Sequence, residues 1–242
     1  MGLRRFHDAG QGMMVATPSL REELAERGFR RIRTWSRGVD LAQFRVELRA
    51  EPDPELSDLP RPLFLYVGRI AVEKNVAAFL ALDLPGTKVV VGDGPQREEL
   101  ALAHPEVVFR GARSGEDLVA HFAGADVFVF PSITDTFGLV ILEAMATGAP
   151  VAGFPAPGPI DLIPGSGAGA LATSLTEGLR EACLACLELD RGVVREFAER
   201  FSWRACAEEF VRNLQPYPEP EKTRFWRRLR RLARLRRRPA QV

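Results

Sequence analysis

Short, continuous runs of apolar residues recur along the middle of the chain, and most are rich in β-branched or aromatic side chains. Runs of this length that are apolar on both faces predict buried strands of a parallel sheet. The predicted strands are 63–67, 88–91, 107–111, 125–130 and 151–153. Between them, apolar residues return every three or four positions, which is the period of a helix. The alternation predicts an α/β fold with a doubly wound parallel sheet.

The amino-terminal segment, residues 1–48, predicts a single β-α-β unit. A helix at 18–27 lies between predicted strands at 13–17 and 31–35 and ends at Gly28. A unit of this size is too small to bury a core of its own.

Frequent prolines then predict extended backbone over 45–61, and we place the linker itself at 49–61. The main domain is 62–214. Helical spacing predicts that this domain closes with helices at 176–189 and 195–214.

The carboxyl-terminal segment, 215–242, differs from the rest of the chain in charge. Residues 222–242 hold Lys222 and nine arginines without an acidic residue, so residues 1–221 carry −9 of a net charge of +1. Apolar residues recur at helical spacing between the arginines, which predicts an amphipathic helix at 222–238 on an anionic membrane surface. Nucleic-acid binding and a disordered solubilising tail are the alternatives. We favour the membrane and expect no nucleic-acid partner.

We expect no signal peptide, and the sequence contains no apolar run near the ~20 residues of a membrane span. We therefore expect a cytoplasmic protein that attaches peripherally to the inner face of the membrane through its basic tail. Three cysteines, an odd number, argue against a disulfide framework. Cys183 and Cys186 form a C-x-x-C, but the segment is helical and lacks a second ligand pair, so we expect neither zinc nor redox chemistry there. The scattered histidines predict no metal site, and His121 is placed on a helix surface.

The sequence FPSITDTFGLVILEAMATGAP at 130–150 carries the first candidate site. A strand is followed by a loop and a helix, which Asp135 or Thr136 is predicted to cap. Amides in the first turn of a helix lack intrahelical partners and suit a phosphate. Here those amides belong to Phe137, Gly138 and Leu139.

Asp135 and Glu143 flank this turn, eight residues apart. At helical rise the separation is roughly 12 Å, about the reach from the sugar ring to the ribose of a nucleoside diphosphate sugar. Each carboxylate can accept hydrogen bonds from hydroxyls, while the amides between them bind the diphosphate. The plainer alternative is that Asp135 is only an N-cap and Glu143 only a solvated helix residue.

A second candidate site follows the first predicted strand of the main domain. Gly68 lets the backbone approach a ligand closely, and Arg69 and Lys74 can supply charge-assisted hydrogen bonds to a diphosphate. The alternative is two surface cations beside a turn. After the next strand, Gly92 and Gly94 add weak support. Ligands of open parallel sheets bind at the carboxyl ends of the strands, where these segments converge.

These motifs resemble the nucleotide-sugar site of the retaining glycosyltransferases of family 4, which have the GT-B fold. The resemblance rests on Pro-Ser, Thr-Phe-Gly-Leu and Glu-Ala-Met-Ala-x-Gly-x-Pro-Val at 131–151, and on Gly-Arg, Glu-Lys-Asn and Gly-Asp-Gly-Pro at 68–95. The family usually has Glu-x7-Glu, whereas the first acid here is Asp135, with a side chain shorter by one methylene. The resemblance implies that the main domain is the Rossmann-like carboxyl-terminal half of a GT-B fold.

The resemblance also implies a reaction. The family transfers a hexose from a nucleoside diphosphate sugar with retention at the anomeric carbon, and we expect a GDP- or UDP-sugar of mannose or glucose type as donor and a lipid or glycan as acceptor. Arg69, Lys74 and the amides near Gly138 and Leu139 would stabilise charge on the departing diphosphate.

The remaining roles follow from the same resemblance. Asp135 would hold the sugar hydroxyls, Glu143 the ribose, and the strand end at Arg110 would border the nucleobase. No metal or other cofactor is expected, because cations and dipoles take its place.

Thr17-Pro18-Ser19 and Gly38-Val39-Asp40 are similar to the end of the family's amino-terminal acceptor domain. The family normally has far more residues ahead of this point, so we interpret 1–48 as a remnant and expect a separately encoded amino-terminal domain as a partner. The alternative function is an incomplete or non-catalytic protein that binds nucleotide sugars or a membrane surface.

Overall fold

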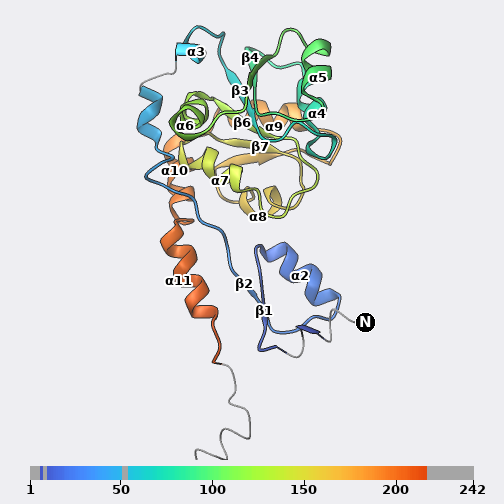
Figure 1. The fold of residues 1–242 in the computed structure, drawn as a ribbon, viewed down its shortest axis with the longest axis vertical. Coiled ribbons are helices and arrows are strands. Elements are labelled where there is room, and N and C mark those ends of the chain that lie inside the picture. The colour runs from blue at the N-terminus through green and yellow to red at the C-terminus, as the bar shows by residue number, and fades with distance from the viewer. Residues whose placement is uncertain (1–5, 8–9, 51–53, 217–242) are drawn as a thin grey trace, which may run out of the picture.

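The computed structural model describes residues 6–7, 10–50 and 54–216, and within them six parallel strands form the main sheet (Figure 1). The strands are β3 (Leu63–Val67), β4 (Thr87–Val91), β5 (Val108–Gly111), β6 (Val127–Phe130), β7 (Val151–Gly153) and β8 (Gly169–Leu171). Their order in the sheet is β5-β4-β3-β6-β7-β8. The chain builds outward from β3 on one side and from β6 on the other, which confirms the predicted doubly wound α/β fold.

Helices cover both faces of the main sheet. They are α4 (Val76–Leu80), α5 (Arg97–Ala103), α6 (Gly115–Gly124), α7 (Leu139–Ala146), α8 (Pro159–Leu162), α9 (Leu179–Cys186) and α10 (Arg191–Glu199). Leu63 and Leu65 belong to a core shared with α6, α7 and α10, whereas Phe64 and Tyr66 belong to a core shared with α4, α5 and α9. Successive side chains of a strand point to opposite faces, so a strand covered on both sides is apolar throughout.

The amino-terminal segment forms the predicted β-α-β unit from β1 (Met13–Val15), α2 (Pro18–Glu26) and β2 (Ile32–Thr34), with β1 and β2 paired in parallel. Thr17 caps α2, because its Oγ1 accepts a hydrogen bond from the Leu20 amide at 3.2 Å. The unit lies beyond α8, away from the main sheet (Figure 1). Ser19 joins the two parts: its amide and its hydroxyl donate to the Asp161 carboxylate at 2.8 and 2.6 Å.

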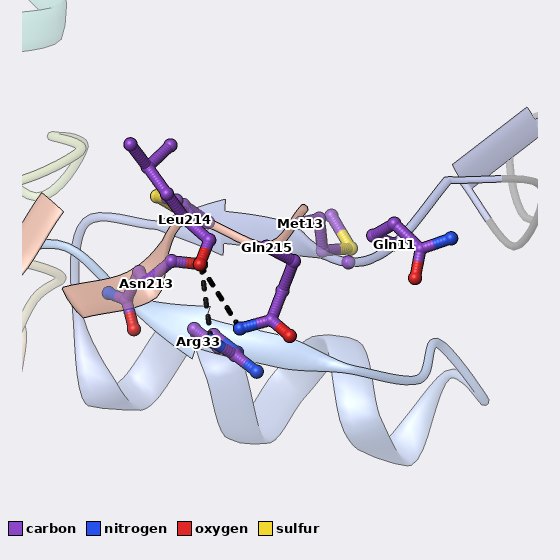
Figure 2. A pocket seen from close by; sticks show the side chains of 8 residues that line it. Gln11, Met13, Arg33, Asn213, Leu214 and Gln215 are labelled. Carbon is purple, nitrogen blue, oxygen red and sulfur yellow. Dashed lines mark hydrogen bonds between the residues drawn. The ribbon is translucent and has the colours of Figure 1, made fainter. Parts of the chain in front are cut away.

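The last helix of the described residues, α11 (Trp203–Asn213), runs back from the main domain to the β-α-β unit (Figure 1). Its end packs across β2: Arg33 Nη1 donates to the Asn213 carbonyl at 3.1 Å, and Asn213 Nδ2 donates to the Thr34 carbonyl at 2.6 Å. Figure 2 shows this junction from close by. The hollow that these residues line has a volume of about 110 Å³. A hollow of this size is below the roughly 300 Å³ at which small-molecule sites begin.

The prediction of extended backbone over 45–61 is wrong. The segment contains a 3₁₀ helix, η1 (Val46–Ala50), and a short helix, α3 (Pro54–Ser57), while residues 51–53 lie outside the described part of the chain. Leu56 of α3 is buried beside Gly124 at the end of α6. Burial of this one apolar side chain against the main domain, rather than local propensity, accounts for the turn of helix.

The two predicted closing helices also differ from those observed. The helix predicted at 176–189 is the shorter α9, and the one predicted at 195–214 is split into α10 and α11. Ser202 starts the second of these, since its hydroxyl accepts a hydrogen bond from the Ala205 amide at 3.2 Å. The basic segment 222–238 lies outside the described residues. Within the described residues, no helix combines the length and the apolar character that crossing a membrane requires.

The prediction that His121 lies on a helix surface is wrong. The ring is fully buried in α6, its Nδ1 lies 2.8 Å from the Asp117 carbonyl, and its Nε2 has no hydrogen-bond partner among the described residues. Cys183 and Cys186 are buried and unpaired in α9, and burial raises the pKa of Cys186 to about 12. A thiol with so high a pKa stays protonated at neutral pH and is chemically inert.

Candidate functional site

The loops that follow β3, β4 and β5 at the carboxyl edge of the main sheet are joined by backbone hydrogen bonds. The Ile70 amide donates to the Asp93 carbonyl at 2.9 Å, and the Gly92 amide donates to the Gly111 carbonyl at 2.8 Å. The loops after the three strands therefore form one connected rim, and the predicted convergence of the motifs at this edge is observed.

Gly92 and Gly94 are required by the contact between two of these loops. A Cβ atom at Gly92 would lie 1.9 Å from the Gly68 carbonyl oxygen, and one at Gly94 would lie 2.2 Å from the Ile70 carbonyl oxygen. Their φ angles, +143° and +159°, also lie in the region that favours glycine. The close approach that these two glycines allow is thus to the neighbouring loop after β3.

Lys74 and Asp135 meet at the centre of the site. The Lys74 ammonium lies 3.0 Å from Asp135 Oδ2, and less than a third of either side chain is exposed. Burial would raise the pKa of Asp135, but hydrogen bonds from Lys74 and from the amides of Thr136 and Phe137 outweigh it and hold that pKa below its ordinary value. Two residues 61 positions apart, expected at different parts of a donor, are in direct contact.

Asp135 also shapes the loop before α7. Its Oδ1 accepts hydrogen bonds from the amides of Thr136, Phe137 and Gly138 at 2.7, 3.3 and 3.2 Å. The helix itself begins only at Leu139, with Gly138 in the N-cap position at φ +77°. The prediction that Asp135 or Thr136 occupies the N-cap position is therefore wrong, because the loop is two or three residues longer than expected.

This longer loop changes the geometry expected of the two acids. Only Leu139 to Glu143 of the interval between them is helical, so the separation of Asp135 and Glu143 cannot be derived from helical rise. The amides of Phe137 and Gly138, expected to bind phosphate, donate to Asp135. An anion at this turn would compete with the carboxylate for them.

Glu143 lies half-buried on α7, and no described residue donates a hydrogen bond to its carboxylate. Burial raises the pKa of this carboxyl group, and no neighbouring cation offsets the effect. A carboxylate that is partly removed from water without a partner is costly. It is the acceptor in this region that hydroxyl donors of a ligand would satisfy best.

Arg69 and Arg110 occupy different surroundings. Arg69 is exposed, with its Nη1 3.4 Å from Glu73 Oε1. Arg110, at the end of β5, is turned instead toward α3, where it hydrogen-bonds the Glu55 carbonyl and pairs with the Glu55 carboxylate at 3.5 Å. The structure thus leaves Arg69 exposed on the loop after β3 and pairs the Arg110 side chain with Glu55 of α3.

Two residues that the sequence analysis did not single out hold the rim in place. The Tyr66 hydroxyl donates to the Arg69 carbonyl at 2.8 Å, directly beneath Gly68. Asn75, at φ +53°, donates from Nδ2 to the Pro131 carbonyl at 3.2 Å and so connects the loops after β3 and β6. No sequence signal could have identified Tyr66, because it lies in an apolar strand like any core residue. Asn75 could have been found, because an asparagine in Glu-Lys-Asn fits a left-handed backbone conformation.

The order of the main sheet and the loops at its carboxyl edge define a Rossmann-like domain, and its structural neighbours are GT-B glycosyltransferases. Sucrose-phosphate synthase from Thermosynechococcus elongatus, for example, superposes with a TM-score of 0.70 at 25% identity, over 86% of this chain and 59% of that protein. Residues 61–189 match the family described as glycosyl transferases group 1, and the chain belongs to this family.

Two curated relatives illustrate the range of the family. The chain is 31% identical to a sulfoquinovosyl transferase of Arabidopsis thaliana, over 88% of this chain and 46% of the relative. It is 37% identical to a GDP-mannose-dependent alpha-mannosyltransferase of Mycobacterium tuberculosis, over 66% of this chain and 43% of the relative. The chain spans less than half the length of either relative.

Proposed function

We propose that this chain is the donor-binding part of a retaining family 4 glycosyltransferase that transfers a hexose from a GDP- or UDP-sugar to a lipid or glycan acceptor. The observation that carries the proposal is the contact between Lys74 and Asp135 at the carboxyl edge of the main sheet, with the unpartnered Glu143 on the helix that follows. A cation can bind the diphosphate, and the two carboxylates can accept hydrogen bonds from the hydroxyls of the sugar and of the ribose. The name of the mycobacterial relative favours GDP-mannose among the donors.

In this proposal the diphosphate binds Arg69 and Lys74, and Lys74 exchanges its bond to Asp135 for one to a phosphate oxygen. Asp135 Oδ2 then accepts a hydrogen bond from a sugar hydroxyl, and Glu143 accepts from the ribose. As the glycosidic bond to the diphosphate breaks, the two cations stabilise the negative charge that develops on the leaving group. We propose that no metal is needed, because these cations supply the positive charge.

We further propose that the acceptor is bound by a separate amino-terminal domain. The support for this is that the match to each relative covers less than half of that relative. Mixing the chain with a separately produced amino-terminal domain is expected to restore transfer from the donor. Attachment to an anionic membrane through 222–238 stays a prediction.

Replacing Glu143 with alanine is expected to weaken nucleotide binding at least tenfold, because hydrogen bonds to a charged group contribute about 1.5–3 kcal/mol. Calorimetric titrations with GDP, UDP, GDP-mannose and UDP-glucose would measure this and identify the base. Glu143→Gln keeps one acceptor oxygen, so its nucleotide affinity should lie between those of the wild type and Glu143→Ala. Glu208→Ala removes an exposed acid of α11 and serves as the control. Folded wild-type protein that binds none of the four ligands, or equal losses in the Glu143 and Glu208 variants, would contradict the proposed function.

Nucleotide affinity should also depend on pH through Glu143. Burial raises the pKa of this group above its ordinary value of 4.5, and the ionised form accepts stronger hydrogen bonds from hydroxyls than the neutral form does. Affinity should therefore be level above the raised pKa and fall by up to about tenfold per pH unit below it. The free energy of unfolding should depend on pH in the opposite direction. Because the pKa of Glu143 is higher in the folded than in the unfolded protein, its contribution to stability is present at low pH and is lost as pH rises through the folded pKa. Titrations across the acidic range should show the decline in the wild type and not in Glu143→Gln.

A further inference from the structure

A polar pocket lies at the edge of the main sheet opposite the candidate site, where three strands begin. Pro62, Asp126 and Pro150 immediately precede β3, β6 and β7 and line it. Its volume is about 470 Å³, within the range of roughly 300–1,000 Å³ that is usual for small-molecule sites. Lys74 and Asp135 follow the carboxyl ends of the strands, so the length of the strands separates the two places.

The charge of this pocket is unbalanced. Arg49, Arg61 and Arg191 line it together with a single carboxylate, that of Asp126. Asp126 Oδ1 lies 2.6 Å from Arg49, and Oδ2 lies 2.7 Å from Arg61. Two positive charges are therefore left without a counter-charge among the described residues that line the pocket.

Part of this cluster has a structural role. Arg49 Nη1 and Arg191 Nη1 each donate to the Ala125 carbonyl at 2.9 Å, and Arg61 Nη1 donates to the Gly124 carbonyl at 3.2 Å. These carbonyls end α6, and cations are favourable at the carboxyl end of a helix. Capping accounts for one side of each guanidinium group, but it does not account for the other side of Arg191.

Arg191 presents two donors that the protein does not use. Its Nε and Nη2 are buried and have no hydrogen-bond partner in the described part of the chain. Buried polar groups are nearly always paired, so these two need an explanation. Burial, with Arg49 and Arg61 adding to it, lowers the pKa of Arg191 to about 10 in spite of Asp126. Nε and Nη2 form the edge of a guanidinium group that binds two oxygens of one anion at once.

The rest of the pocket is apolar. Leu187 and Leu189, just after α9, line it beside Cys186 and the two prolines. We propose that this pocket binds an organic phosphomonoester, with Arg191 holding two phosphate oxygens and the apolar wall contacting the attached carbon group. A phosphate dianion matches the two positive charges that Asp126 leaves unbalanced. The phosphate can belong to a soluble metabolite or to a lipid headgroup, because both present the same group.

The test is a calorimetric titration of the full chain with phenyl phosphate and with inorganic phosphate. We expect phenyl phosphate to bind more tightly than inorganic phosphate, and Arg191→Gln to weaken it at least tenfold. Arg191→Lys, which keeps the charge but loses the two-donor edge, should be weakened to a lesser extent. Arg204→Gln, at an exposed arginine of α11, is the matched control, and Lys74→Gln checks for binding at the donor site. Arg204→Gln should bind like the wild type, Lys74→Gln should keep the binding that depends on Arg191, and thermal unfolding confirms that each variant is folded.

Flotation with phosphatidylcholine vesicles, with and without phosphatidic acid, separates the two sources of the phosphate. Binding of phenyl phosphate that depends on Arg191 supports a soluble ligand, and binding to phosphatidic acid alone that depends on Arg191 supports a lipid. Absence of binding in both assays overturns the proposal. Equal binding by the wild type and Arg191→Gln, or a loss confined to Lys74→Gln, overturns it as well.

Discussion

Replacing Gly92 with alanine is expected to lower the free energy of unfolding by about 3–5 kcal/mol, which places it among the most damaging single substitutions. The new Cβ would lie 1.9 Å from the Gly68 carbonyl oxygen, and the obstacle is backbone that cannot rotate away. The loops after β3 and β4 would have to separate, at the expense of the bond from the Gly68 amide to the Val91 carbonyl. Urea unfolding of wild type and variant measures the loss.

Gly115→Ala is the matched control for this prediction. Gly115 also has a positive φ, +59°, but nothing lies within 4 Å of the position its Cβ would take. The alanine should be strained in this left-handed conformation, and the free energy of unfolding should fall by only about 1–2 kcal/mol. Similar losses in the two variants would show that the loops yield easily and that the rim is not rigid. A larger loss at Gly92 would also imply weaker nucleotide binding, because the displaced loop carries Arg69.

Replacing Asp126 with alanine is expected to cost about 3 kcal/mol of unfolding free energy. The carboxylate accepts a hydrogen bond from the Leu63 amide at 2.8 Å and pairs with Arg49 and Arg61. Removing it leaves a cluster of partly buried guanidinium groups with no carboxylate among them. Removal of one partner from a buried ion pair costs more free energy than the intact pair contributes, because the other charge stays buried without compensation. Glu208→Ala breaks an exposed pair on α11 instead and should change stability by less than about 0.5 kcal/mol.

The contribution of Asp126 should depend on pH. Burial would raise the pKa of this group, but the Leu63 amide, Arg49 and Arg61 together hold it below its ordinary value of 3.8. Since the folded pKa is lower than the unfolded one, the contribution is complete above about pH 4 and is lost as pH falls through the folded pKa. The stability difference between wild type and Asp126→Ala should shrink below pH 4. A difference that stays constant there would mean that packing, not charge, is the source of the effect.

Much of the fold could be predicted from periodicity alone. Strands covered on both faces are largely apolar, so β3, β6 and the three valines of β4 are visible as short apolar runs. The failures lie where local sequence is overridden by contacts with distant parts of the chain. The turn of helix at α3 depends on the burial of Leu56. His121 is buried because other elements cover its side of α6, and the sequence of α6 alone does not show which of its sides are covered.

The candidate site was predictable in location but not in pairing. The order of strands placed Arg69, Lys74, Asp135 and Glu143 after strand ends or on the helix that follows, and parallel strands bring their carboxyl ends to one edge. That Arg110 turns to Glu55 could not be known from sequence, because the direction of a long side chain depends on the charges it meets in the folded protein. The same holds for the arginines around Asp126, which come from three separated segments.

The sequence by itself determined the class of fold, the edge of the sheet that carries the motifs, and the membership in a family of glycosyltransferases, because all three follow from order and spacing along the chain. Only the tertiary structure decided that Lys74 pairs with Asp135 and that, among the described residues, Glu143 has no hydrogen-bond donor and two donors of Arg191 have no partner. The physical reason is that pairing and burial depend on distances between residues far apart in sequence. Those distances exist only once the chain has folded.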